Sequence, residues 1–111
     1  MKEDYQENEI KMARYAKALS HPARLQILRL LASSATCYCG NLVDELPLSQ
    51  STVSQHLKEL KDAGLIQGVI QPPKVKYCIN PAAWEEASKL FGEFLQIKNA
   101  VFCEVEEIVK E

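Results

Sequence analysis

Cysteine thiols are the side chains in this sequence best suited to bind a soft ion or to undergo oxidation. Cys37 and Cys39 lie two positions apart in the stretch TCYCG, whereas Cys78 and Cys103 each stand alone. Thiolates are soft ligands that favour thiophilic ions. On a helix, residues i and i+2 point about 200° apart, but in an extended turn they can lie on the same side. Cys37 and Cys39 are therefore a candidate ion-binding pair if TCYCG forms a turn.

The amino-terminal sequence bears on the redox state of these thiols. The first residues, MKEDYQENE, lack the apolar core of a signal peptide, and no apolar run approaches the roughly 18 residues of a membrane span. We therefore expect a cytoplasmic protein that makes no membrane contact and keeps its cysteines reduced. Metal binding, redox sensing and simple burial are then the alternatives for the thiols.

Length and charge suggest a single domain with one mildly basic surface. A chain of 111 residues is at the small end of domain sizes, where a second subunit often supplies missing burial. The net charge of −2 argues against a protein covered in charge that binds nucleic acid. Residues 49–76, however, hold four lysines and two acidic residues, a local charge of +2, so the remainder carries −4. Such an asymmetry is compatible with a DNA-facing edge on an acidic body.

Hydrophobic spacing predicts the helices that would position these side chains. Apolar residues recur at helical spacing through residues 4–19, and a second helix begins at SHPARLQILRLLASS, where Ser20 can cap and Pro22 suits the first turn. NLVDEL supplies about two further turns before a proline stops it. A fourth helix, at about residues 50–63, has Ser49 as its cap and Gly64 as its stop. Two helices joined so closely are a helix-turn-helix candidate.

The remaining sequence predicts a hairpin and a long last helix. LIQGVI and VKYCI flank QPPK, which favours a β-hairpin, or wing, at about residues 65–79. Asn80 can cap a helix with Pro81 in its first position, extending over about residues 81–109. We therefore predict one domain, residues 1–111, that is mainly α with a small β-hairpin: a winged helix-turn-helix fold.

The last helix also predicts a homodimer. Its apolar stripe exceeds what one small core can cover, so a second copy would bury it, although packing within one chain is the alternative. The larger members of this stripe are Trp84, Phe91, Phe94, Phe102 and Ile108.

The outer face of the helix at residues 50–63 carries the candidate DNA-reading groups. Val53, Leu57 and Leu60 are expected to face the core. Short polar side chains near a helix N-terminus suit base edges in the major groove, whereas a lysine suits phosphates. The alternative is a polar face that is merely solvated. The outward positions are Gln50, Ser51, Thr52, Ser54, Gln55, His56 and Lys58.

The segments SHPARLQILRLL, LPLSQSTVSQHLKELKDAGLI and the strand ending in YCI resemble the ArsR/SmtB, or arsenic-repressor, family of bacterial winged-helix repressors over residues 10–108. The resemblance implies a homodimer formed by the first and last helices, and a palindromic double-stranded DNA operator that is released when an inducer binds. It also implies that Gln50, Ser51, Ser54 and Gln55 contact bases.

Two further parts of the DNA surface follow from the same resemblance. His21 and Arg24 match positions near the DNA backbone, although a capping or packing role is the alternative for His21. Many relatives carry several arginines at the wing tip, whereas QPPKVK offers only Lys74 and Lys76 to phosphates.

The resemblance implies an inducer site at the Cys-x-Cys pair, near the start of the third helix. Cys39 lies one residue further from Ser49 than in the commonest family form, and residues 81–111 contain no histidine for a zinc or nickel site on the last helix. Arsenite or antimonite would need three thiols, while cadmium, lead and zinc accept three or four ligands. The third thiol would be Cys103 or Cys78. No obligatory cofactor is expected.

The thiols also have alternative roles that the sequence does not distinguish. Cys78 suits a small buried hydrophobic position, and Cys103 suits helix packing. A redox or sulfur-species sensor of the same fold would oxidise Cys37 or Cys39 together with Cys103, and a repressor without a small inducer is a further alternative. A small thiol enzyme or metallochaperone would need a βαβ pattern around Cys-x-Cys, but helices are predicted there. We therefore expect no enzymatic activity.

Overall fold

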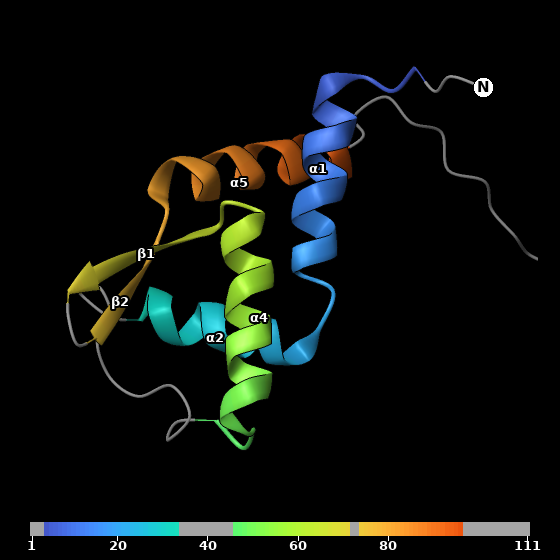
Figure 1. The fold of residues 1–111 in the computed structure, drawn as a ribbon. Coiled ribbons are helices and arrows are strands. Elements are labelled where there is room, and N and C mark those ends of the chain that lie inside the picture. Colours follow the sequence, from blue (N-terminus) through green and yellow to red (C-terminus); the bar gives the residue numbers. More distant parts are fainter. Residues whose placement is uncertain (1–3, 34–45, 72–73, 97–111) are drawn as a thin grey trace, which may run out of the picture.

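The computed structural model of the chain describes residues 4–33, 46–71 and 74–96. Four helices and one antiparallel hairpin occur in these ranges, as Figure 1 shows. This arrangement confirms the expected fold class. The elements are α1 (Glu7–Ala18), α2 (Pro22–Ala32), α4 (Gln50–Asp62), β1 (Ile66–Gln71), β2 (Lys74–Ile79) and α5 (Pro81–Leu95).

Side-chain caps determine where three of the helices begin. The Ser49 hydroxyl accepts a hydrogen bond from the Thr52 backbone N–H at the start of α4, and Asn80 caps α5 in the same way, as expected. The expected cap of α2 is wrong by one position. His21 caps this helix, because its Nδ1 accepts a hydrogen bond from the Ala23 backbone N–H at 3.0 Å. Ser20 instead donates to the Lys17 carbonyl at 2.7 Å, at the end of α1.

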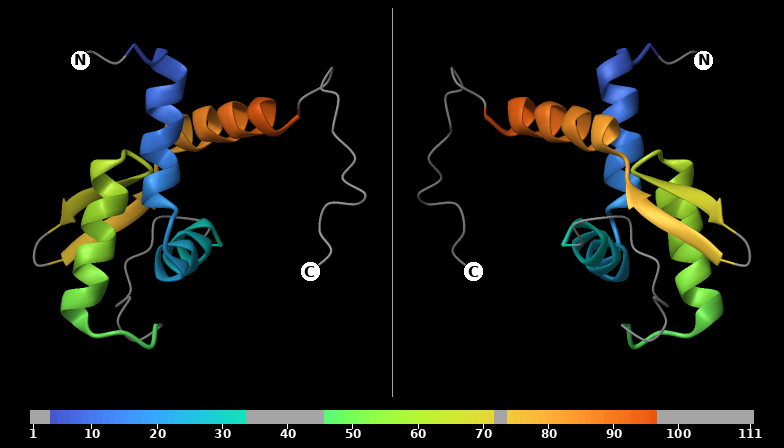
Figure 2. Two further views of the ribbon diagram at one scale, coloured as in Figure 1. Left: turned by 90° about the vertical axis from the view of Figure 1, so that its right-hand side faces the viewer. Right: turned by 90° about the vertical axis from the view of Figure 1, so that its left-hand side faces the viewer.

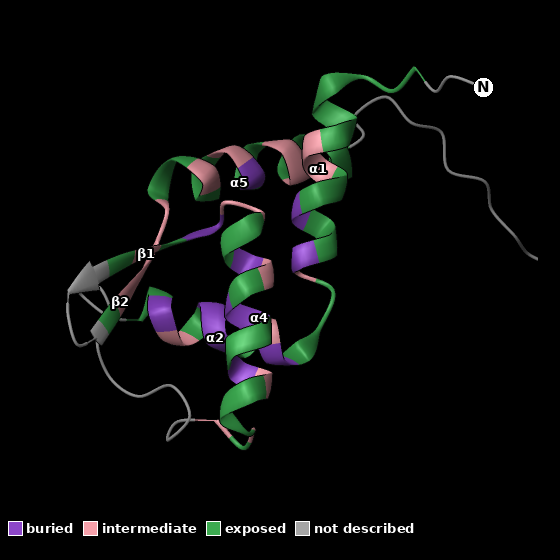
Figure 3. Ribbon diagram, in the orientation of Figure 1, coloured by how far each residue is buried: buried purple, intermediate pink, exposed green. Residues whose placement is uncertain are grey.

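One hydrophobic core joins the helices to the base of the hairpin. Ile27 on α2, Leu60 on α4 and Leu65 just before β1 are its largest fully buried side chains, and Figure 3 shows the buried surfaces of these elements facing one another. The predicted inward residues of α4 all belong to this core. Its buried members are Tyr15, Ala18, Ile27, Leu28, Leu31, Val53, Leu57, Leu60, Leu65, Ile66 and Ala87.

The end of α4 is a Schellman motif centred on Gly64. The Gly64 N–H donates to the Lys61 carbonyl and the Leu65 N–H donates to the Leu60 carbonyl. Gly64 has a φ of +84°, a left-handed conformation that glycine adopts without a steric penalty. The chain therefore turns sharply from α4 into the wing, so this glycine sets the angle between the two elements.

Replacing Gly64 with alanine is expected to destabilise the fold by about 1 to 2 kcal/mol. Nothing lies within 4 Å of the added Cβ, so the loss would come from the backbone conformation alone. Gly92, inside α5, also has no neighbour within 4 Å of an added Cβ but has no positive φ, so Gly92→Ala is the matched control. Chemical denaturation should show a small gain in stability for the control. Equal effects of the two substitutions would contradict this role of Gly64.

The hairpin and α5 complete the described fold. β1 and β2 pair in register from Ile66 opposite Ile79 to Gln71 opposite Lys74, which agrees with the expected wing. Helix α5 crosses α1, as the views in Figure 2 show, and ends at Leu95 with Gln96 as its C-cap. The helix was expected over residues 81–109, and the part of it from residue 97 onward lies outside the described ranges.

Polar contacts hold α1 against α5. The Tyr15 hydroxyl donates to Glu86 at 2.6 Å, and the Lys11 ammonium group lies 3.0 Å from the same carboxylate. The hydrogen bond from Tyr15, followed by that from Lys11, lowers the pKa of Glu86 below its usual value. Glu86 is therefore ionised at neutral pH and anchors both side chains. Among the described residues, none of the helices combines the length and apolarity needed to cross a membrane.

Candidate nucleic-acid interface

The outer face of α4 presents a row of exposed polar side chains. Figure 3 shows exposed and buried positions alternating along this helix, and the buried ones are Val53, His56, Leu57 and Leu60. Its buried side packs against α2, so the opposite side is free to approach a ligand. Thr52 is half-buried, and the exposed members of the predicted reading set are Gln50, Ser51, Ser54, Gln55 and Lys58.

The first turn of α4 is organised by hydroxyl groups. Ser49 Oγ lies 3.0 Å from Thr52 Oγ1 and 3.3 Å from Ser51 Oγ, in addition to its cap bond to the backbone. Thr52 therefore takes part in the capping arrangement as well as bordering the outer face. Small hydroxyl groups at this end leave space for the backbone to approach a base pair closely, as a recognition helix entering the major groove requires.

Exposed ion pairs and hydrogen bonds hold the second half of this face. Lys58 lies 2.9 Å from Asp62, one turn further along the helix, and Gln55 Nε2 donates to Glu59 at 3.4 Å. The hydrogen bond to Asp62 raises the pKa of Lys58 above its usual value, so this lysine is charged at neutral pH. Exposed contacts of this spacing contribute little to stability. Both contacts can therefore be exchanged for contacts to DNA at little cost.

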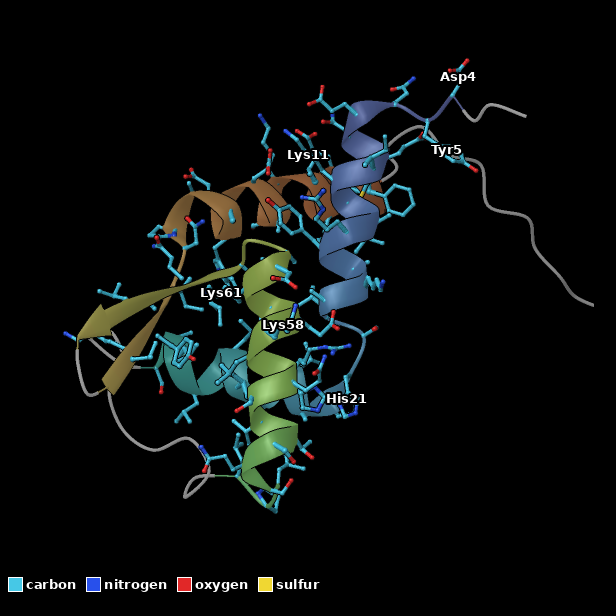
Figure 4. The ribbon with its side chains drawn as sticks, in the orientation of Figure 1. Asp4, Tyr5, Lys11, His21, Lys58 and Lys61 are labelled. Atoms are coloured by element: carbon cyan, nitrogen blue, oxygen red, sulfur yellow. The ribbon has the colours of Figure 1, made fainter. Side chains whose placement is uncertain are left out.

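A shallow cleft of about 300 Å³ lies between α4 and the wing. Lys58 and Lys61 line it together with Tyr77 of β2, and Figure 4 shows both lysines along this side of α4. Lys61 was not among the predicted DNA-binding residues. Its spacing of three residues from Lys58 is the signal that could have identified it, because positions i and i+3 share a helix face. Lys76 is half-buried on β2, whereas the side chain of Lys74 lies outside the described part.

His56 lies on the other side of α4 from the position predicted for it. Only 8% of its surface is exposed, so it faces the interior and not the outer row. Counting along a helix of 3.6 residues per turn explains the difference, because His56 lies three residues after buried Val53 and four before buried Leu60. Its polar ring suggested an exposed position, but the residue faces the interior. Direct contact between His56 and bases is excluded in this conformation.

His21 and Arg24 meet His56 at the start of α2. The imidazole rings of His21 and His56 have centroids 4.4 Å apart, and Arg24 Nη1 lies 3.4 Å from His56 Nδ1. Figure 4 places His21 at the turn between α1 and α2. The three residues predicted to contact DNA from these positions thus form one cluster between α2 and α4. His21 is the exposed member, and Arg24 is half-buried.

The predicted thiol site lies mostly outside the described residues. Cys37, Cys39 and Cys103 all fall outside them, whereas Cys78 lies on β2 opposite Gln67, is half-buried, and is disulfide-bonded. Within the described ranges, no group of three or more His, Cys, Asp or Glu side chains is arranged to hold a metal ion. The predicted thiol ligands other than Cys78 thus lie in the ranges 34–45 and 97–111.

Comparisons with known proteins give one consistent result. A family model described as a helix-turn-helix domain matches residues 19–69. The HTH-type transcriptional regulator CmtR of Mycobacterium tuberculosis is 34% identical over 90 residues, which is 81% of this chain and 73% of CmtR. The NMR structure of CmtR, a cadmium metal-sensor, aligns with a TM-score of 0.53 at 31% identity, covering 90% of this chain and 99% of that one.

Two further relatives extend this result. The arsenical resistance operon repressor of Staphylococcus xylosus is 44% identical over 50 residues, covering 45% of this chain and 47% of the repressor. The structure of HlyU from Vibrio cholerae N16961 aligns with a TM-score of 0.64 at 32% identity, covering 83% of this chain and 95% of HlyU. The family model includes α2, α4 and the first residues of β1, and α4 carries the polar face.

Proposed function

Because this chain belongs to the ArsR/SmtB family of winged helix-turn-helix transcription regulators, which are not enzymes, we propose that it is a repressor controlled by its thiols. As a homodimer it binds a palindromic DNA operator, and it releases this operator when a thiophilic ion binds Cys37 and Cys39. The observation that carries the DNA-binding part is the exposed polar face of α4 beside a cleft lined by two lysines.

The exposure and position of side chains on α4 indicate which of them would contact bases and which would contact phosphates. Gln50, Ser51, Ser54 and Gln55 are exposed on the turns of α4 nearest its N-terminus, where side chains reach base edges. Lys58 and Lys61 lie further along, in position to contact phosphates on the strand that passes the wing. In a twofold dimer, each protomer would present one α4 as a reading head. The two reading heads would contact half-sites about one DNA turn apart, roughly 34 Å from centre to centre.

A gel shift with the DNA upstream of the chain's own gene tests the DNA-binding part. The protein should retard this fragment at concentrations that leave a scrambled fragment of equal length free. Its affinity should fall with salt, but with a shallow slope, because each head offers few cations. Equal retardation of both fragments, or of neither, would remove the proposed repressor function.

The proposed inducer class rests on thiol chemistry and on the relatives. Thiolates prefer arsenite, antimonite, cadmium, lead and zinc to hard ions. Among the similar proteins, CmtR is a cadmium metal-sensor and another represses an arsenical resistance operon. The third ligand would be Cys103 or, after reduction of its disulfide, Cys78.

Serine substitutions test the sensor. In the fully reduced protein, bound to a fluorescent operator fragment, the effective ion of this set should lower DNA affinity by about 5- to 150-fold, the usual range of allosteric coupling. Cys37→Ser and Cys39→Ser should each abolish this response without changing ion-free DNA affinity. Ser33→Ala, an exposed change at the end of α2, is the control and should respond normally. An unchanged response in both cysteine variants would contradict the assignment.

One observation favours a second candidate, a thiol-redox or sulfur-species sensor of the same fold. Cys78 is disulfide-bonded in the structure, so this chain accommodates an oxidised cysteine at its wing. In a redox sensor, peroxide or polysulfide would oxidise the thiols in place of ion binding, and the repressor would then release its operator. Quantitative thiol labelling before and after oxidation distinguishes the two. Loss of labelled thiols that parallels DNA release supports redox sensing, and DNA release with every thiol still reduced supports ion binding.

A further inference from the structure

A buried histidine joins the recognition helix to α2. His56 is 8% exposed and is the buried polar or charged side chain of the described core. Its neighbours on α4, Gln55 and Leu57, lie on the exposed face and in the core respectively. Any movement of His56 would therefore displace both the base-reading face and the packing behind it.

The contact to Arg24 defines which ring nitrogen of His56 must be unprotonated. A guanidinium group has only donors and stays charged, so the bond of 3.4 Å between Arg24 Nη1 and His56 Nδ1 requires His56 to accept. The Nε atom of Arg24 is buried and has no hydrogen-bond partner in the described part of the structure. His56 Nδ1 is thus the acceptor that the structure supplies to this guanidinium group, and the bond is lost if Nδ1 takes up a proton.

The charges around His56 oppose its protonation. Burial lowers the pKa of His56 below the ordinary value of 6.5, and His21 and Arg24 on the α2 side lower it further, while Glu59 on its own helix acts in the opposite direction. His56 is accordingly neutral at neutral pH. A proton on Nδ1 would place two cations face to face and turn the acceptor into a second donor.

We propose that neutral His56 is a positioning residue for DNA binding: it docks α4 on the start of α2 through Arg24 and His21, and its protonation loosens this contact and weakens the hold on DNA. The DNA-binding consequence rests on the proposed repressor function. The contact itself is a property of the fold and can be measured without DNA.

His21 couples the same cluster to the local structure of α2. Its Nδ1 accepts the cap bond from Ala23 while its ring lies against His56, with 50° between the ring planes. The first turn of α2 also carries Arg24, so the cap, the ring contact and the guanidinium contact stabilise one another. A proton on His56 Nδ1 removes an acceptor from this arrangement.

The direction of the pH effect follows from linkage. The folded pKa of His56 is depressed, so the stability that the neutral ring contributes is complete above 6.5 and is lost as the pH falls through the folded pKa. Operator affinity should follow the same course. A role for His56 in packing alone would make substitution destabilising, but operator affinity would then have no pH dependence that depends on His56.

The test measures operator affinity by fluorescence anisotropy between pH 8 and pH 5.5 for the wild type, His56→Gln and His21→Asn. Glutamine keeps an acceptor for Arg24 but does not titrate, and asparagine keeps a cap. Wild-type affinity should weaken by about tenfold over this range, which is a change of about 1.4 kcal/mol in binding free energy. His56→Gln should bind within about twofold of the wild type at pH 8 and show a much flatter profile, while His21→Asn should retain most of the dependence.

Two measurements on the protein without DNA complete the test. NMR titration of the wild-type imidazole signals should give His56 a midpoint below 6.5, and the unfolding midpoint should fall with pH more steeply in the wild type than in His56→Gln. A midpoint at or above 6.5, or a pH profile that survives in His56→Gln, overturns the proposal. Absence of operator binding at pH 8, with these two results as expected, instead removes the repressor function and leaves the His56 contact established.

Discussion

Replacing both Gln50 and Gln55 with alanine is expected to abolish operator-specific binding while leaving the fold intact. Both side chains are exposed on the outer face of α4, so their loss creates no cavity in the core. A good contact to a base edge contributes about 1–3 kcal/mol of discrimination, and a twofold dimer would lose two glutamine contacts at each head. The expected loss is at least about 100-fold in affinity for the operator.

Anisotropy titrations with operator and scrambled DNA measure this effect. Binding to scrambled DNA should persist in the double variant with its salt dependence unchanged, because Lys58 and Lys61 remain available to phosphates. Gln26→Ala, an exposed change on α2, is the matched control and should bind as the wild type. If the double variant still prefers the operator by the wild-type factor, the bases are read by other residues.

The course of the chain through α4 and the wing could be predicted because local signals there agree with tertiary packing. The Ser49 cap, the spacing of Val53, Leu57 and Leu60, and the Gly64 stop each indicate the same helix. The structure has that helix at Gln50–Asp62, within one residue of the expected end. Consistency between cap, periodicity and stop is what makes such a prediction reliable.

The helix start that was missed depends on a weak local signal. His21 caps α2 in place of Ser20, and both residue types can accept from a backbone N–H, so only the conformation of the turn decides between them. On α5, the periodicity predicts an apolar stripe, and Phe94 in this stripe is 60% exposed in the structure. Periodicity reports which face is apolar, but it does not report what that face packs against.

The arrangement of the candidate site was only partly predictable for the same reason. The exposed row on α4 follows from helical spacing, but the inward position of His56 was missed because a polar residue type was taken to indicate an outward position. The cluster of His21, Arg24 and His56 joins residues more than thirty positions apart, and its contacts depend on how α2 crosses α4. No local pattern encodes that crossing.

Placing a charge in the apolar face of α5, by Phe94→Glu, is expected to convert the proposed dimer into monomers and to remove tight operator binding. Phe94 and Leu95 are 60% and 74% exposed, and Ile10 on the neighbouring helix α1 is 52% exposed. Apolar surface of this extent on two packed helices is costly in water and is characteristic of an interface. A twofold arrangement would bring each Phe94 close to its symmetry mate or to the same patch on the partner. In the variant, the two carboxylates introduced there would be buried without a counter-charge.

Light scattering during size-exclusion chromatography measures the first effect, and operator titration measures the second. Linking two reading heads raises affinity by about 10²- to 10⁴-fold over one head, so monomers should lose affinity by a factor in this range. Lys89→Glu introduces the same side chain at an exposed position on the opposite side of α5 and should remain dimeric. Because Phe94 is exposed in the single chain, its replacement should not unfold the monomer, and circular dichroism should show unchanged helix content. A Phe94→Glu protein that stays dimeric would place the interface on another surface and separate dimerisation from the apolar face of α5.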